Sequence, residues 1–291
     1  MTVYVSTSCL KSDDDMSVVI ETYCKNGINN VELGPSLKSV GEIDKIKRFG
    51  LNFIVHHYFP PPPKPFIVNL ASQNAEILQL SRKQIKKSID FCCESGIKLF
   101  TLHAGFRTDP DLNFKFPKDQ PINSYNKAFN TFVESVHEIN DYALMKGIKL
   151  AIENNVLSEH NVIEGKNELL LLCEAIEYEN LWEKVRSDNL GILLDVGHLN
   201  VTAHWLKFDK YDFIERVKKK IFAFHIHDNN GKSDTHSRIN RSSWFIEAIS
   251  KYNFVDIPVV LEMTNLTIEQ IIQDIKIIEN VINNSQIKKG P

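Results

Sequence analysis

Seven short apolar segments of this chain end in side chains that can bind a metal ion or move a proton. The segments read VELG, IVHHY, TLHAG, LAIENN, ILLDVGH, FAFHIHD and VVLEM. Their polar ends carry Glu32, His56 and His57, His103, Glu153, Asp195 and His198, His225, His227 and Asp228, and Glu262. A mixture of carboxylates and imidazoles suits Mn²⁺, Co²⁺, Mg²⁺ or Zn²⁺, whereas sites for soft metals need thiolates. We therefore expect a divalent metal ion as the cofactor.

Four of these residues end consecutive apolar runs in the second half of the chain, namely Glu153, Asp195, His225 and Glu262. Each one alone is equally compatible with a buried polar group that its neighbours satisfy. Three carboxylates in one site, however, would repel one another strongly at low dielectric. A divalent cation is the simplest compensation, so the set predicts one shared metal site.

Segments typical of strands and of helices alternate along the chain and must position these residues. Strands are predicted at residues 3–8, 30–33, 52–58, 99–105, 149–154, 190–196, 221–227 and 258–263. Helices are predicted near residues 16–26, 38–49, 74–95, 124–146, 167–185, 242–251 and 267–282, with a shorter helical region before residue 221. Residues 60–65, PPPPKP, cannot be helical and must form an extended loop.

Helices between successive strands imply parallel pairing and an α/β fold. An open doubly wound sheet would concentrate functional residues at one switch point, and the chain has neither GxGxxG nor GxxxxGK[ST]. A closed barrel brings the carboxyl ends of all its strands to one rim, as the spread of polar residues requires. We therefore predict a single-domain (β/α)8 TIM barrel over residues 1–284 and a C-terminal tail over residues 285–291.

The composition is that of an ordinary globular protein, with 43% hydrophobic and 24% charged residues in a chain of 291. The formal net charge of -3 provides no general basic field, which disfavours nucleic acid as a partner. Five cysteines without CxxC spacing argue against a disulfide framework and for a reducing compartment. The chain shows no signal-peptide pattern and no apolar run near the roughly 20 residues that span a bilayer. We expect a cytoplasmic protein without a membrane segment.

The segments LAIENN, ILLDVGHLN, HIHDNNGKSDTH and VVLEM resemble the xylose isomerase-like TIM-barrel superfamily. This superfamily includes sugar isomerases, ketose 3-epimerases, inosose dehydratases and the endonuclease IV group. Similarity to the epimerases implies that Glu153, Asp195, His225 and Glu262 bind one divalent metal ion. It also implies that Glu153 and Glu262 act as acid and base on opposite faces of a sugar. That chemistry is physically consistent, because a metal that polarises a carbonyl acidifies the neighbouring C–H group.

A second layer of residues resembles the additional metal-binding positions of endonuclease IV-like proteins. These residues are His57 or His56, His103, His198, Asp234 and His236. They could equally bind substrate hydroxyls or phosphate, or orient the primary ligands. His227 and Glu32 are further candidates for substrate contact or for a second metal. Strand alternation lets only one of His56 and His57 face the barrel interior, and we choose His57 because it lies closer to the rim.

The loop after His236 departs from the Gly-Glu-Gly turn that is common in both groups of relatives. It reads Ser237, Arg238, Ile239, Asn240 and Arg241. Arg238 and Arg241 could bind a phosphate or carboxylate of the substrate, or they could simply be solvated.

We interpret the chain as a divalent-metal-dependent isomerase or epimerase that acts on a sugar or sugar derivative by removing a proton next to a carbonyl. The small-molecule sugar is the expected partner, and a homo-oligomer is compatible with the sequence. Dehydration of a keto-sugar needs the same proton abstraction and is one alternative. An endonuclease IV-like phosphodiesterase with three zinc ions and abasic-site DNA as substrate is another. A sugar-binding barrel without catalysis is a third, and the retained Glu153 and Glu262 disfavour it.

Overall fold

Eight parallel strands form a closed barrel in the computed structural model, which describes residues 1–12, 15–34, 48–118, 120–252, 254 and 256–287. The strands follow the order of the sequence: β1 (Thr2–Ser6), β2 (Asn30–Leu33), β3 (Asn52–His56), β4 (Leu99–His103), β5 (Lys149–Glu153), β6 (Leu190–Asp195), β7 (Ile221–Ile226) and β8 (Pro258–Leu261). The first strand pairs in parallel with the last, with Val3 opposite Val259. This pairing closes the ring and excludes an open sheet, so the predicted single-domain (β/α)8 TIM barrel is confirmed.

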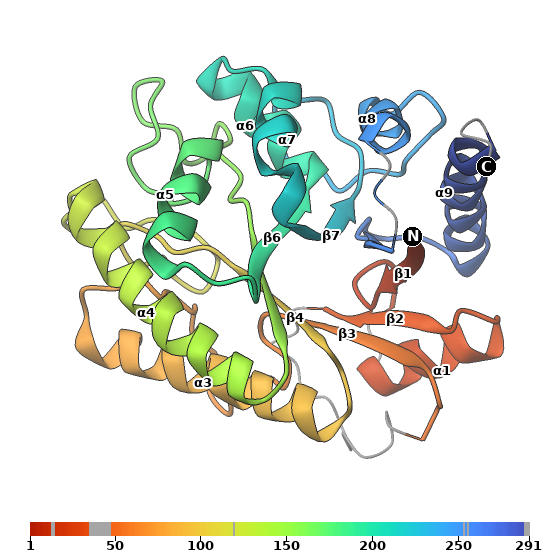
Figure 1. Ribbon diagram of the computed structural model, residues 1–291, viewed down its shortest axis with the longest axis horizontal. Helices are drawn as coiled ribbons and strands as arrows, with labels where there is room; N and C mark the ends of the chain where they lie inside the picture. The colour runs from red at the N-terminus through yellow and green to blue at the C-terminus, as the bar shows by residue number, and fades with distance from the viewer. Residues whose placement is uncertain (13–14, 35–47, 119, 253, 255, 288–291) are drawn as a thin grey trace.

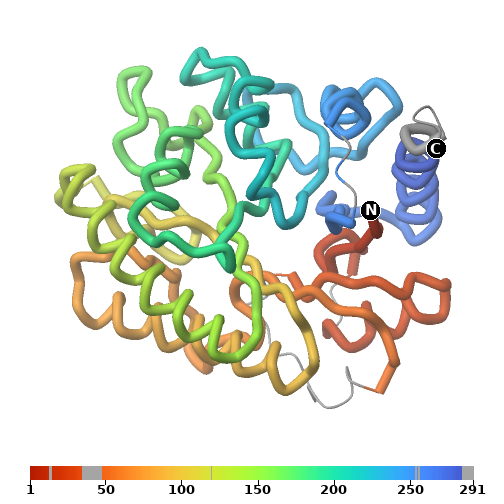
Figure 2. The backbone as a smooth tube through the Cα atoms, in the orientation of Figure 1, coloured from red at the N-terminus to blue at the C-terminus, as the bar shows by residue number. Residues whose placement is uncertain are grey.

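Helices surround the barrel, as Figure 1 shows. The described helices are α1 (Met16–Lys25), α3 (Ala75–Glu94), α4 (Tyr125–Met145), α5 (Ala175–Val185), α6 (Val196–Leu206), α7 (Lys210–Val217), α8 (Trp244–Tyr252) and α9 (Ile268–Ile287), with a short 3₁₀ turn at Lys218–Lys220. Asn74 begins α3 because its side chain accepts hydrogen bonds from the first turn of that helix. In Figure 2, the start of the chain at β1 lies near the final helix α9.

The register of the strands brings polar residues to one level at the carboxyl rim. His103 lies opposite Glu153 across the β4–β5 pair. Asp195 lies opposite His225 across the β6–β7 pair. Because all strands run in the same direction, these four side chains emerge at the same end of the barrel.

The apolar character of the strands reflects burial on both faces. All six residues of β6 are buried, and the neighbouring strands β5 and β7 are largely so. Parallel strands covered by helices are expected to be apolar throughout, which explains why the polar residues at their ends stand out in the sequence.

The prediction of a helix at residues 167–185 was partly wrong, because α5 begins only at Ala175. The preceding residues form a loop that places Leu169, Leu170 and Cys173 in a second apolar cluster with Phe106. Leu170 also forms an isolated bridge with Phe106. Apolar residues of this kind resemble one face of a helix in the sequence, although here they pack together in a loop.

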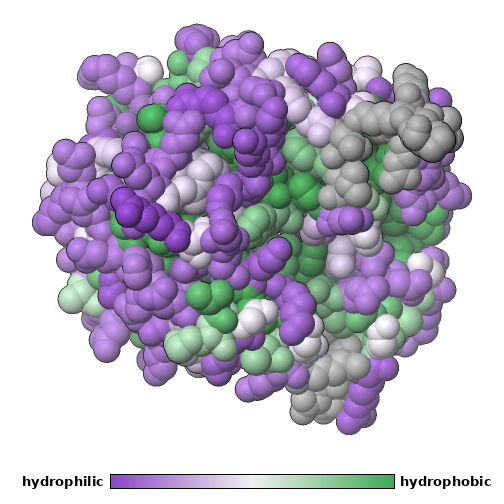
Figure 3. All heavy atoms as spheres, in the orientation of Figure 1, coloured by the Kyte–Doolittle hydropathy of each residue, from purple (hydrophilic) through white to green (hydrophobic). Residues whose placement is uncertain are grey.

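Two other predictions touch residues outside the described ranges. The helix predicted at 38–49 falls mostly within residues 35–47, and part of the predicted tail falls within 288–291. Within the described residues, α9 continues to Ile287. No helix in the described ranges combines the length and apolar character that crossing a membrane requires. Hydrophilic residues cover most of the face shown in Figure 3, with smaller hydrophobic patches between them.

Candidate metal centre

Glu153, Asp195, His225 and Glu262 meet at the carboxyl rim of the barrel. Nδ1 of His225 lies 3.0 Å from Oε1 of Glu153, 3.1 Å from Oε2 of Glu262 and 3.9 Å from Oδ2 of Asp195. One ligand atom from each of the four residues lies within 4.8 Å of the others, and all four side chains are buried. We call this group the first cluster. The structure thus brings together the four residues that the sequence predicted to share a metal ion.

Two carboxylate oxygens of the first cluster lack a hydrogen-bond donor among the described residues, as oxygen atoms that bind a cation would. Oδ2 of Asp195 and Oε2 of Glu153 are buried and accept no hydrogen bond from any described residue. A buried carboxylate oxygen without a donor is costly, and a divalent ion would satisfy it. The donor set of three carboxylates and one imidazole is also one that Mn²⁺, Co²⁺, Mg²⁺ or Zn²⁺ accepts.

In the metal-free protein, the positive charge in the first cluster is that of protonated His225. Burial lowers the pKa of His225, but the charges of Glu262, Glu32 and Glu153 raise it well above its usual value. Burial raises the pKa of Glu262, but the charge of His225 and its hydrogen bond lower it to about 2. Glu262 is therefore ionised beside an imidazolium, so a positive charge lies where a metal ion would bind.

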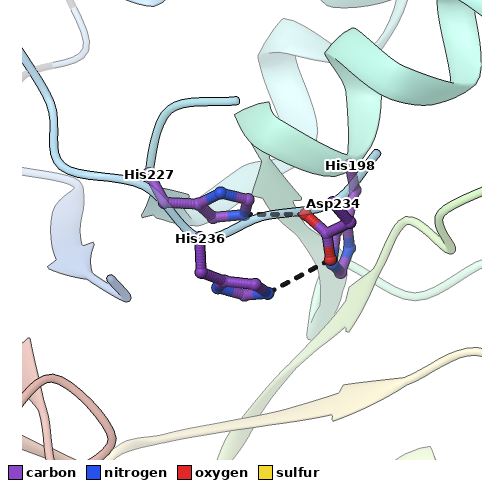
Figure 4. Close-up of side chains that lie close together, drawn as sticks. All are labelled: His198, His227, Asp234 and His236. Carbon is purple, nitrogen blue, oxygen red and sulfur yellow. Dashed lines mark hydrogen bonds and ion pairs between the residues drawn. The ribbon is translucent and has the colours of Figure 1, made fainter. Parts of the chain in front are cut away.

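A second cluster consists of His198, His227, Asp234 and His236, which Figure 4 shows close together. Asp234 is its centre, with Oδ2 3.3 Å from His198 Nε2 and 3.1 Å from His236 Nε2. Its other oxygen, Oδ1, lies 3.6 Å from His227 Nε2. His198 comes from the first turn of α6, and the other three residues follow β7.

Backbone carbonyl groups fix how two histidines of the second cluster present their lone pairs. His198 Nδ1 lies 2.9 Å from the Asn154 carbonyl oxygen, and His236 Nδ1 lies 2.7 Å from the Glu262 carbonyl oxygen. A carbonyl oxygen only accepts, so both Nδ1 atoms must carry a proton. In the neutral rings, the lone pairs on Nε2 then point toward Asp234, as metal ligands would.

A third cluster consists of His56, His103 and Glu153. Nε2 of His56 lies 3.1 Å from Nε2 of His103, whose Nδ1 lies 3.1 Å from Oε2 of Glu153. The Thr101 hydroxyl donates to the Val55 carbonyl group and therefore accepts from Nδ1 of His56, 2.8 Å away. This leaves the lone pair of His56 on Nε2. Burial and the charge of His103 hold the pKa of His56 well below its usual value, so the ring is neutral and able to bind a metal.

Two carboxylates connect the three clusters. Glu153 directs Oε1 to the first cluster and Oε2 to the third. Asp195 lies in the first cluster and also places Oδ1 3.2 Å from Nε2 of His227 in the second. Burial raises the pKa of Asp195, but the charges of His198 and His227 more than offset this and lower it. The arrangement is therefore one continuous group of ligand atoms.

The choice of His57 over His56 as the inward-facing residue was wrong. His56 is the last residue of β3, and its ring reaches to 3.6 Å from Glu153. His57 has a positive φ of 50°, which ends the strand and turns its ring onto Tyr58 at 4.1 Å between centroids. Nδ1 of His57 still accepts a hydrogen bond from the backbone N–H of His103. His57 therefore helps to position His103 in the third cluster.

Arg238 does not face the clusters. Its guanidinium group donates to both carboxylate oxygens of Asp274 at 2.8 and 3.0 Å, and Asp274 is fully buried in α9. Neither alternative for Arg238, contact with substrate or simple solvation, describes this ion pair, which connects the loop after His236 to α9. Arg241 is exposed.

Glu32 and Asp228 both contact other residues of the chain. Glu32 is fully buried, and its Oε2 lies 2.8 Å from Nε2 of His225, on the side of the ring away from the first cluster. Asp228 accepts hydrogen bonds from Ser243 and Asn240 and shapes the loop that follows β7.

The sequence did not indicate the groups that orient the histidines. This role belongs to Thr101 and to the backbone carbonyl groups of Asn154 and Glu262. Every residue has a carbonyl group, so the sequence cannot show which of them will orient a histidine. Gly197 was also missed, although a glycine between Asp195 and His198 was a visible signal. A Cβ atom at that position would fall 1.9 Å from the His227 ring.

Comparisons with known proteins agree with the barrel fold. A solved structure described as a D-tagatose 3-epimerase-like protein superposes with a TM-score of 0.77 at 20% identity, and the match covers 100% of both chains. The uncharacterized protein MJ1614 of Methanocaldococcus jannaschii is 25% identical over 93% of this chain and 95% of its own length. A probable endonuclease 4 of Thermosipho africanus is 26% identical over 60% of this chain and 56% of its own length. The sequence pattern of the family described as xylose isomerase-like TIM barrel matches residues 42–281, and the chain therefore belongs to that family.

Proposed function

We propose that this protein is a divalent-metal-dependent isomerase or epimerase that acts on a small sugar or sugar derivative. The observation that carries the proposal is the position of Glu153 and Glu262, two buried carboxylates that approach the same nitrogen of His225 from β5 and from just after β8. Likeness to a D-tagatose 3-epimerase-like protein over the whole chain supports it.

The first cluster supplies the residues that this chemistry needs. Glu153, Asp195, His225 and Glu262 would hold the ion, which when bound polarises a carbonyl group and the neighbouring hydroxyl. One glutamate takes the proton from the carbon next to the carbonyl, and the other returns a proton to the opposite face. Glu262 is ionised at neutral pH, because His225 lowers its pKa to about 2 despite its burial.

Dehydration of a keto-sugar begins with the same proton removal. The products separate the two reactions, because an epimerase conserves the composition of the sugar whereas a dehydratase releases water from it.

A phosphodiesterase of the endonuclease IV kind is the second candidate, and one observation favours it. The second and third clusters supply further groups of ligand atoms beside the first, with Asp195 in contact with His227 and Glu153 shared with the third cluster, so the described residues could hold more than one ion. The similarity to a probable endonuclease 4 supports this candidate. The formal net charge of -3 disfavours binding to DNA.

Metal analysis of protein purified without added metal separates the candidates. One ion per chain, with exchange of solvent deuterium into ketoses, is expected for the isomerase or epimerase. Three zinc ions with cleavage of abasic-site DNA would instead establish the phosphodiesterase.

Two variants then test the catalytic glutamates. Glu153→Gln and Glu262→Gln should each lower the exchange rate by about 10²–10⁴-fold, as removal of a general acid or base does. Glu177→Gln is the matched control, because Glu177 is a buried carboxylate outside the clusters. Exchange that survives both substitutions would refute the proposed roles.

A further inference from the structure

The ring of His225 is held between carboxylates on both sides. Nδ1 faces Glu153 and Glu262 in the first cluster. Nε2, on the opposite edge of the ring, lies 2.8 Å from Oε2 of Glu32. Glu32 belongs to β2, which β1 and β8 separate from β7 in the ring of strands, and both side chains are fully buried.

We propose that Glu32 is a positioning residue that fixes the tautomer of His225 and strengthens it as a metal ligand. Its carboxylate accepts the Nε2–H of the ring, which leaves the lone pair on Nδ1 directed into the first cluster. A carboxylate behind a ligating imidazole also raises the basicity of the ligating nitrogen. This inference rests on the metal site of the proposed function and adds a role for a residue outside that site.

The burial of Glu32 makes its hydrogen bond to His225 important for the stability of both side chains. Oε1 of Glu32 is buried and has no hydrogen-bond partner among the described residues. The contact with His225 is therefore the main polar support of a carboxylate with no exposed surface. A tautomer with the proton on Nδ1 would place two lone pairs against each other at 2.8 Å, which is unfavourable in a dry environment. When a bound ion replaces the proton on Nδ1, the contact with Glu32 therefore keeps the remaining proton on Nε2.

A direct role of Glu32 as a ligand is the competing arrangement, since Glu32, His56 and His225 also place ligand atoms within 4.8 Å of one another. It would require Nε2 of His225 to leave Glu32 as hydrogen-bond acceptor and to coordinate an ion instead. It would also draw Nε2 of His56 away from His103, 3.1 Å from it. Both existing contacts favour Glu32 as a support for His225 instead of a ligand.

Zinc titration of the metal-free full-length protein, in competition with a chelating dye, tests the proposal. Glu32→Gln should weaken zinc binding by about 10–100-fold without changing the number of ions, which is the usual effect of losing such a supporting partner. Glu177→Gln, the buried control, should bind zinc as the unchanged protein does. Equal affinity in Glu32→Gln would overturn the proposal, and the loss of one whole ion would assign Glu32 as a ligand and overturn it too.

A spectroscopic measurement on the unchanged protein keeps the proposal testable if Glu32→Gln does not fold. In zinc-loaded protein with ¹⁵N-labelled histidine, His225 should show a proton on Nε2 in a strong hydrogen bond, assigned by its disappearance in His225→Gln. A proton on Nδ1 with zinc on Nε2 would refute the inference. If the unchanged protein bound no ion at all, the proposed function itself would fail, which is a separate outcome.

Discussion

The imidazole ring of His227 packs directly against the backbone of Gly197, where a Cβ atom would lie 1.9 Å from Cε1 of the ring. Gly197 is the second residue of α6 and follows the strand end that carries Asp195. The missing side chain lets Nε2 of His227 come within 3.2 Å of Asp195. The close approach of the His227 ring to α6 therefore allows the contact between His227 and Asp195, which connects the second cluster to the first.

Gly197→Ala should destabilise the protein and displace His227. Alanine is the better helix former, so helix propensity alone predicts a gain of nearly 1 kcal/mol. The steric conflict outweighs this gain, because forcing extra atoms into a packed interior costs about 1–3 kcal/mol. Denaturant unfolding of metal-free protein measures the net loss.

The double variant Gly197→Ala/His227→Ala is the control for that experiment. If the conflict is with the His227 ring, removing the ring should restore most of the lost stability, and the two effects should be strongly non-additive. Additive losses would show that Gly197 is needed for another reason.

Arg238→Gln should reduce stability while leaving the first cluster intact. The substitution leaves the fully buried Asp274 without the two hydrogen bonds that the guanidinium group donates. An unsatisfied buried acceptor costs about 1–3 kcal/mol, measurable as a lower denaturant midpoint. Arg216→Gln is the control, since it breaks an exposed pair with Glu179 and should cost at most about 1 kcal/mol. An increased KM with unchanged stability would instead place Arg238 at the substrate.

The positions of the main ligands could be predicted from the sequence because one physical rule governs them. In a barrel, both faces of each strand are buried, so an acidic or imidazole group at a strand end is conspicuous, as Glu153 and Asp195 are. All strands point the same way, so these ends meet. Prediction of the fold and of the first cluster follows from this rule.

The finer placement depended on features that local sequence does not specify. The orientation of His56 and His57 was decided by the positive φ of His57, which no neighbouring residue type required. The role of Arg238 was decided by Asp274, a partner 36 residues away on helix α9. A contact between residues far apart in the sequence forms only in the folded protein, so the local sequence does not predict it.

Metal affinity should increase with pH between about 6 and 9. A protonated imidazole cannot bind a metal, and the pKa values of His198 and His225 lie well above the usual value. Burial lowers the pKa of His236, but its hydrogen bond to Asp234 and the charge of Glu262 raise it to about 9. Zinc must displace these protons, so titration calorimetry in buffers of different ionisation enthalpy should detect proton release. Affinity that is constant from pH 6 to 8 would contradict this expectation.

The same shift predicts the opposite trend for the stability of metal-free protein. The pKa of His236 is about 9 in the folded state against 6.5 for an ordinary histidine. Its protonation therefore stabilises the fold fully below about pH 6.5, and this contribution is lost as the pH rises through 9. The melting temperature of the chelator-treated protein should fall over that range, and His236→Gln should flatten the decline.

Asp195 has two roles that paired substitutions can separate. As the first residue before α6, it accepts a hydrogen bond from the His198 backbone, and its carboxylate also belongs to the first cluster. Asparagine preserves the helix cap but removes the charge, whereas alanine removes both. Metal-free Asp195→Asn should therefore lose only the favourable charge interaction with His198 and His227, and Asp195→Ala should lose about 1 kcal/mol more, the usual value of a cap. A bound ion stabilises the folded state by about 2.7 kcal/mol when its free concentration is 100 times Kd. Adding zinc should raise the melting temperature of the unchanged protein, and both variants should lose most of that increase. A full zinc-induced increase in Asp195→Asn would show that the carboxylate is not a ligand.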